Sequence, residues 1–246
     1  MPSVCRVGSA ALAVALLCGW TSVRLPILEY HRVSARPTAS EVTRALTVSP
    51  QEFAAEMTWL HDAGFHAVTE GQLLGAFALG LPLPPRPIMI TFDDGYRDVL
   101  WNAAPVLHRL HMPATAYVIV DRIGTDSSFL TWGELGRLER LGFDIGSHTV
   151  HHVDLTAVPP ATVRAELVDS RRELERGLGR SVYWLSYPLG RFDPAVAAAA
   201  RRAGYLLAVT EVPGVRQTSP LALHRFEILD STGLRGLKTL LASVLR

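Results

Sequence analysis

The feature that most constrains the fold is a regular alternation of short apolar segments with amphipathic ones over residues 87–210. The apolar segments have the length of buried strands, and the segments between them carry apolar residues at helical spacing. Strands that alternate with helices through short connections form a mainly parallel sheet covered by helices. The predicted strands are PIMITF at 87–92, ATAYVIV at 114–120, FDIGS at 143–147, SVYWLSYP at 181–188 and YLLAVT at 205–210.

The flanking segments extend the same pattern. Ser49, Pro50 and Glu52 occupy the N-cap, N1 and N3 positions of a predicted helix that ends at Gly64. The polar stretch 34–50 contains two prolines and is predicted to be a loop. The other predicted elements are a strand at 25–31, a strand at 65–69, a helix at 71–80, a last strand at 221–228 and a closing helix at 233–246. The class is therefore α/β, and the repetition suits a barrel better than an open sheet.

Composition excludes several classes of protein. The chain has 246 residues, 48% of them apolar, which suits one large folded domain. Its 24 basic and 23 acidic residues leave a net charge of +1 without a basic stripe, so no nucleic-acid partner is expected. The two cysteines, Cys5 and Cys18, both precede the main body, which therefore has neither a disulfide framework nor a cysteine zinc site.

The first 23 residues are predicted to be a targeting segment. Arg6 is followed by an uncharged, mainly apolar stretch at 7–23, a length between a signal peptide and a membrane-spanning helix. Both a signal peptide and a membrane anchor remain open, and an ordinary buried helix is disfavoured because the segment is apolar on all sides. We expect an exported protein, either secreted, periplasmic or anchored to the membrane and facing outward, with its catalytic domain at 24–246.

Polar residues follow three of the predicted strands. They are DDG at 93–95, SHTVHH at 147–152 and SYPLGRFD at 186–193. The carboxyl ends of parallel strands meet at one edge of a sheet or barrel, where active sites lie. Asp93 and Asp94 can form a turn with Gly95, or two carboxylates of one active site with different tasks.

The second of these segments points to a metal site. His148 and His152 are four residues apart, and on one helical turn their imidazoles would share a face. Two neutral imidazoles and one carboxylate form a common hydrolytic zinc site with positions left for water and substrate. His151, between them, would then point elsewhere.

Together these segments resemble the polysaccharide deacetylases of carbohydrate esterase family four. The resemblance rests on TFDDG at 91–95, SHTVHHVDL at 147–155 and YPLG at 187–190, and it extends over residues 27–228. EYHRV at 29–33 is similar to the branch of exported poly-N-acetylglucosamine deacetylases. The resemblance implies a distorted (β/α) barrel with fewer than eight repeats.

The resemblance also implies roles for single residues. One divalent metal would bind to Asp94, His148 and His152; its mixed ligands favour zinc, while cobalt, nickel or iron would also fit. Asp93 would be the general base. The resemblance further implies that a backbone N–H near Leu189 stabilises the oxyanion and that His224 is the general acid.

Two positions depart from the family pattern. Ser186 stands where relatives carry an arginine that orients the catalytic aspartate, and Arg191 is a candidate replacement. His224 is a weaker match than the other motifs, and His31 is a further strand-end histidine that could line the pocket.

The sequence therefore predicts a metal-dependent hydrolase that removes N-acetyl groups from an N-acetylglucosamine-containing polysaccharide. Peptidoglycan or chitin oligomers are alternative substrates, and an O-acetyl xylan esterase is a further alternative. A glycan-binding module without turnover is disfavoured because all four motif residues are intact. A two-metal phosphoesterase is disfavoured because one Asp and two His are too few ligands for two ions.

Overall fold

A computed structural model describes residues 22–35 and 40–244. The predicted targeting segment lies almost entirely outside these residues, so the structure leaves that prediction as it stands. Within the described part of the chain, no helix has both the length and the apolar character needed to cross a membrane.

The core of the fold is a curled parallel sheet in the strand order β10-β9-β8-β7-β6-β2-β12, with the short strand β5 (His66–Ala67) added beside β6. All of these neighbouring strands pair in parallel. The structure thus confirms the distorted barrel with fewer than eight repeats. The strands are β2 (Ile27–Tyr30), β6 (Pro87–Phe92), β7 (Ala114–Val118), β8 (Phe143–Ser147), β9 (Trp184–Ser186), β10 (Leu207–Val209) and β12 (Phe226–Glu227).

The two edges of the sheet are joined by the segment 223–227. At one end, Leu223 forms a parallel bridge with Val209 of β10. At the other end, β12 pairs with β2. The last strand predicted from sequence is therefore much shorter than expected, because the chain there changes partner from β10 to β2.

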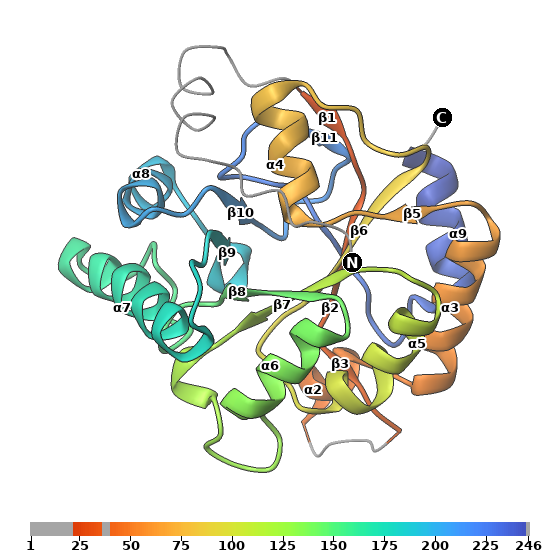
Figure 1. The fold of residues 1–246 in the computed structure, drawn as a ribbon, viewed down its shortest axis with the longest axis horizontal. Coiled ribbons are helices and arrows are strands. Elements are labelled where there is room, and N and C mark those ends of the chain that lie inside the picture. The colour runs from red at the N-terminus through yellow and green to blue at the C-terminus, as the bar shows by residue number, and fades with distance from the viewer. Residues whose placement is uncertain (1–21, 36–39, 245–246) are drawn as a thin grey trace.

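Helices surround the sheet (Figure 1). Ser49 caps α3 as predicted, and Thr131 with Glu134 forms a capping box on α6. The helix after β6 begins as a π-helical turn, η1 (Val99–Ala103), before it becomes α5. The helices are α3 (Pro50–Asp62), α4 (Glu70–Leu79), α5 (Ala104–Arg109), α6 (Trp132–Arg140), α7 (Pro160–Leu178), α8 (Pro194–Ala203) and α9 (Gly233–Val244).

The prediction of a loop at 34–50 is wrong for its second half. Ser40 accepts a hydrogen bond from the Thr43 backbone N–H and caps a short helix, α2 (Glu41–Ala45). The strand β4 (Thr47–Val48) then pairs with β3 (Arg32–Val33). These five- and two-residue elements are too short to produce a periodic signal in the sequence. A separate antiparallel ribbon joins β1 (Val23–Arg24) to β11 (Arg216–Gln217).

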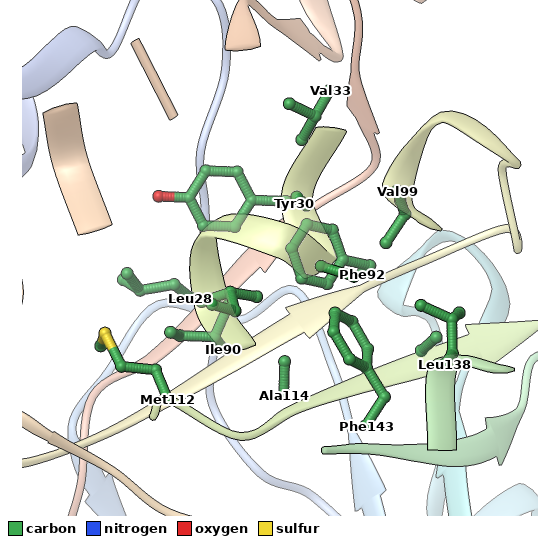
Figure 2. Packing of buried hydrophobic residues seen from close by; sticks show 14 of the residues in the cluster. Leu28, Tyr30, Val33, Ile90, Phe92, Val99, Met112, Ala114, Leu138 and Phe143 are labelled. Atoms are coloured by element: carbon green, nitrogen blue, oxygen red, sulfur yellow. The ribbon is translucent and has the colours of Figure 1, made fainter. Parts of the chain in front are cut away.

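The largest hydrophobic cluster lies between the outer face of the sheet and the helices (Figure 2). Tyr30 stacks on Phe92 with ring centroids 5.7 Å apart, and Phe92 lies 5.7 Å from Phe143. Because neighbouring residues of a strand point to opposite faces, Thr91 and Asp93 are turned inward when Phe92 is packed outward. The packing of Phe92 in the core therefore fixes the direction of the Asp93 side chain, the candidate general base.

Candidate active site

The three polar segments predicted from sequence meet at the carboxyl ends of β6, β8 and β9. Asp93 and Asp94 directly follow β6, His148 and His152 follow β8, and Ser186 ends β9. The strand register accounts for the meeting, since these strands are parallel and end at the same level.

Asp94, His148 and His152 form a cluster that fits a metal ion. Asp94 Oδ1 lies 3.6 Å from His148 Nε2 and 3.8 Å from His152 Nε2, and the three ligand atoms lie within 4.8 Å of one another. A tetrahedral ion with ligand distances of about 2.0–2.1 Å separates its ligand atoms by about 3.4 Å. The two separations from Asp94 Oδ1 are within a few tenths of an ångström of that value, so the three residues fit one ion.

The protonation state of the two histidines suits metal binding. His148 Nδ1 lies 2.9 Å from the Ser186 backbone carbonyl, to which its N–H donates, so Nε2 faces Asp94 as an acceptor. Burial lowers the pKa of His148 to about 3. Burial also lowers the pKa of His152. Both imidazoles are therefore neutral, which is the form that coordinates a metal.

The ligands lie on bent backbone and not on the helical turn that the sequence suggested. Asp94 has φ 71°, Thr149 φ 66° and His152 φ 59°, a left-handed conformation that non-glycine residues adopt at a cost of about 1–2 kcal/mol. Such strain persists where surrounding contacts enforce it.

Here Glu166 of α7 supplies such contacts. Its Oε2 accepts hydrogen bonds from the backbone N–H groups of Val150 and His151. His151 itself turns away from the site, as predicted, and its Nδ1 lies 2.6 Å from Glu166 Oε1.

Asp93 differs from Asp94 in its hydrogen-bond partners. It is 1% exposed, and Arg225 donates from Nη1 to Oδ1 and from Nη2 to Oδ2, both at 2.8 Å. The Ser186 hydroxyl also donates to Asp93 Oδ2 at 2.8 Å. Burial on its own would raise the pKa of Asp93, but the charge and the hydrogen bonds of Arg225 outweigh it and hold that pKa below its usual range. Asp93 is thus an ionised carboxylate at neutral pH.

Arg225 is therefore the arginine that orients Asp93, a role for which the sequence suggested Arg191. It is fully buried, and its Nε donates to the Thr210 carbonyl. Arg191, the candidate suggested by the sequence, instead pairs with Asp154 at the surface at 2.7 Å. The sequence signal for Arg225 was an arginine inside a predicted strand, but only the closure of the sheet shows that it faces Asp93.

The structure places the remaining predicted residues less directly. Leu189 follows β9 with a left-handed backbone at φ 58° and a side chain that is 46% exposed. The role of its backbone N–H as a donor to the oxyanion stays a prediction. Among the described residues, His224 has no hydrogen bond or ion pair with Asp93, Asp94, His148 or His152. Its ring packs so closely on Gly214 that a Cβ added to that glycine would lie 3.0 Å from the ring. His31, by contrast, is buried in the pocket, where burial lowers its pKa and the charges of Asp93 and Asp94 oppose that shift.

The arrangement has the parts of a hydrolytic site: a cluster that fits a metal ion, and next to it an ionised carboxylate fixed by three hydrogen bonds. His148 Nε2 lies 3.7 Å from Asp93 Oδ2, so base and cluster face one small volume. A water held there could lose its proton to Asp93 while it attacks a carbonyl group.

Comparison with known proteins agrees with this chemistry. Residues 80–208 match the model of the family described as "Polysaccharide deacetylase". Protein YxkH of Bacillus subtilis (strain 168), whose name places it among the polysaccharide deacetylases, is 33% identical over 215 residues, which are 87% of this chain and 74% of YxkH. The poly-beta-1,6-N-acetyl-D-glucosamine N-deacetylase of Staphylococcus aureus (strain MSSA476) is 25% identical over 72% of this chain and 68% of its own length. The solved structure of the Streptococcus pyogenes deacetylase PplD in complex with acetate superposes with a TM-score of 0.82 at 27% identity, covering 89% of this chain and 98% of that one.

Proposed function

Because this chain belongs to the polysaccharide deacetylase family, whose members are hydrolases, we propose that it removes N-acetyl groups from an N-acetylglucosamine-containing polysaccharide in a metal-dependent reaction. The observation that supports this most strongly is the pairing of two adjacent carboxylates with different partners. Asp94 faces two neutral imidazoles, whereas Asp93 faces Arg225 and Ser186.

Asp94, His148 and His152 would hold the metal, most readily zinc, which when bound polarises the acetyl carbonyl and makes water easier to deprotonate. Asp93 accepts the proton of the attacking water. Its two oxygens are fixed by Arg225 and Ser186, so the base meets the water in one orientation. The backbone N–H of Leu189 is proposed to donate to the oxyanion that forms.

The substrate proposal follows the S. aureus relative, which is named for its action on poly-beta-1,6-N-acetyl-D-glucosamine. An amide is a harder bond to cleave than an ester, and a site with both a metal cluster and a fixed base is suited to it. Chitin oligomers, peptidoglycan and O-acetylated xylan are the comparison substrates.

The proposal is tested by acetate release from β-1,6- and β-1,4-linked N-acetylglucosamine oligomers. We expect release to stop with a chelator and to return when zinc is restored. Asp93→Asn should lose at least about 100-fold in kcat, because the amide cannot take up the proton, while it keeps the bound metal. Normal turnover by Asp93→Asn would contradict the role of Asp93. Binding of glycan without acetate release from any N- or O-acetylated glycan would favour a binding module.

We also propose export, with a catalytic domain at 24–246. The support is the uncharged stretch at 7–23 behind Arg6. Cell fractionation with N-terminal sequencing tests this, and a cytosolic product that begins at Met1 would contradict it.

A further inference from the structure

Two of the three proposed metal ligands lie in one short loop after β8. This ligand loop, residues 147–152, carries His148 and His152. Thr149 and His152 in it have left-handed backbone, a conformation that is unfavourable for non-glycine residues and persists where surrounding contacts enforce it. Contacts from outside the loop must therefore maintain the positions of the ligands.

One set of outside contacts involves only backbone. The N–H groups of Val120 and Asp121 donate to the carbonyls of Thr149 and Val150, each at 3.1 Å. Replacing the side chains on either side leaves such bonds in place. A second set comes from side chains of α7, a helix that packs beside β8 and contributes no ligand (Figure 1).

Glu166 makes the first of these side-chain contacts. Its Oε2 accepts from the backbone N–H groups of Val150 and His151, at 2.9 and 3.0 Å, and the residue is 4% exposed. One carboxylate oxygen thus fixes two successive peptide groups that lie between the two histidine ligands.

Ser170, one helical turn further along α7, makes the second contact. Ser147 Oγ donates to Ser170 Oγ at 2.9 Å and accepts from the Thr149 N–H at 3.0 Å. The Tyr205 hydroxyl lies 3.0 Å from Ser170 Oγ and fixes it from the other side. Thr149 Oγ1 in turn accepts from the His152 N–H at 3.1 Å. A buried chain of hydrogen bonds therefore connects α7 to the backbone of a metal ligand.

We propose that Glu166 and Ser170 are positioning residues that set the affinity of the site for its metal ion. Neither is a ligand, and both act through the ligand loop. A site that is correctly formed for only part of the time binds with an affinity reduced by that fraction, so losing a contact from α7 weakens binding although all three ligands remain. The inference rests on the metal site of the proposed function and adds residues that determine how tightly it binds.

Co²⁺ binding tests the inference, because the visible spectrum of the ion reports its coordination. The full chain is freed of metal and titrated with Co²⁺ against a competing chelator. Glu166→Leu should bind Co²⁺ about 10- to 100-fold more weakly than wild type, since both backbone N–H groups lose their acceptor. Glu166→Gln should recover most of this affinity and the wild-type spectrum, because an amide oxygen still accepts from both. Ser170→Ala should weaken binding by about two- to tenfold, the effect of one hydrogen bond.

Two controls separate these contacts from general effects on the helix. Glu173→Leu is the matched control, because it makes the same substitution two turns further along the same face of α7. His151→Ala removes the ring that pairs with Glu166 and keeps the backbone N–H groups. Both should bind Co²⁺ as wild type does. Unfolding temperatures of the metal-free variants establish that each is folded, and Ser170→Ala decides the matter if Glu166→Leu is not.

Wild-type affinity in a folded Glu166→Leu, or in Ser170→Ala, would overturn the inference. So would an equal loss in Glu166→Leu and Glu166→Gln, since the bonds to the backbone would then not be what positions the ligands. A wild type that binds no Co²⁺ would overturn it together with the metal dependence of the proposed function. Normal Co²⁺ binding without acetate release would count against the deacetylase proposal alone.

Discussion

Replacing Arg225 with methionine tests how Asp93, the proposed general base, is held. Arg225 supplies two of the three side-chain hydrogen bonds to Asp93, and both partners are buried. Removing one partner of a buried ion pair costs about 3–5 kcal/mol because it leaves an uncompensated charge. Against a typical stability of about 5–15 kcal/mol, the variant should remain folded but unfold at a clearly lower urea concentration.

The same change should reduce turnover. Without the two bonds from Arg225, Asp93 is restrained only by Ser186, and a displacement of about 1 Å at a catalytic group can cost roughly 100-fold in rate. We therefore expect kcat for acetate release to fall by about 100-fold with a smaller change in KM. Arg225→Lys should recover part of this loss, because lysine restores the charge but not the paired geometry.

The pH dependence of stability carries a definite sign. The pKa of Asp93 in the folded protein lies below its unfolded value of about 3.9, so its ionised form stabilises the fold above that pH, and this is lost as pH falls through the folded pKa. In Arg225→Met, burial is no longer outweighed and the pKa of Asp93 should rise. The stability difference between wild type and variant should therefore be largest near neutral pH and shrink as pH falls through the raised pKa of Asp93 in the variant.

Arg191→Met is the control, because Arg191 is the arginine that the sequence suggested for this role and it pairs with Asp154 at the surface. It should leave turnover and the urea midpoint nearly unchanged. If Arg225→Met behaved like Arg191→Met in both measurements, Arg225 would not be what fixes Asp93.

Three further predictions concern the loops around the site. His224→Gln should keep kcat within about twofold, since the ring lies against Gly214; a loss of 100-fold or more in the acetate assay would instead support the general acid predicted from sequence. Gly190→Ala should lower the unfolding temperature by several degrees, because φ is 61° and the added Cβ would lie 2.5 Å from the Glu211 backbone nitrogen; an unchanged temperature would contradict this contact. The hydrogen bond that His151 donates to the Glu166 carboxylate raises the pKa of His151, so NMR titration of Glu166→Gln should show that pKa falling, and no shift would count against the pairing.

The alternation of strands and helices could be predicted because each element carries its own periodic signal. Ser49 marked the start of α3 correctly, since a cap is a local interaction. The helix α2 was missed because five residues contain little more than one turn. Local signals therefore sufficed for elements long enough to show a period.

The candidate site divides in the same way. Asp94, His148 and His152 could be found in sequence because they lie within motifs at strand ends. The backbone conformation of these residues could not be predicted, because the left-handed conformation of His152 depends on contacts such as those between α7 and the loop after β8. Arg225 lies outside the matched residues 80–208 and reaches Asp93 only through the closure of the sheet.

That closure explains how a serine can stand at position 186, where the family resemblance led us to expect an arginine. A serine at the end of β9 is short, and its hydroxyl both donates to Asp93 and accepts from Arg225 at 3.0 Å. The space left beside Asp93 is filled by the guanidinium of Arg225, which enters from the segment that joins β10 to β2. The charge that holds Asp93 therefore comes from Arg225 and not from position 186. Because the Ser186 backbone carbonyl also orients His148, this one position couples the base to the metal cluster. A larger side chain at position 186 would compete with Arg225 for the same volume. We therefore expect an arginine at position 186 to be tolerated only when Arg225 is replaced by a smaller residue in the same variant.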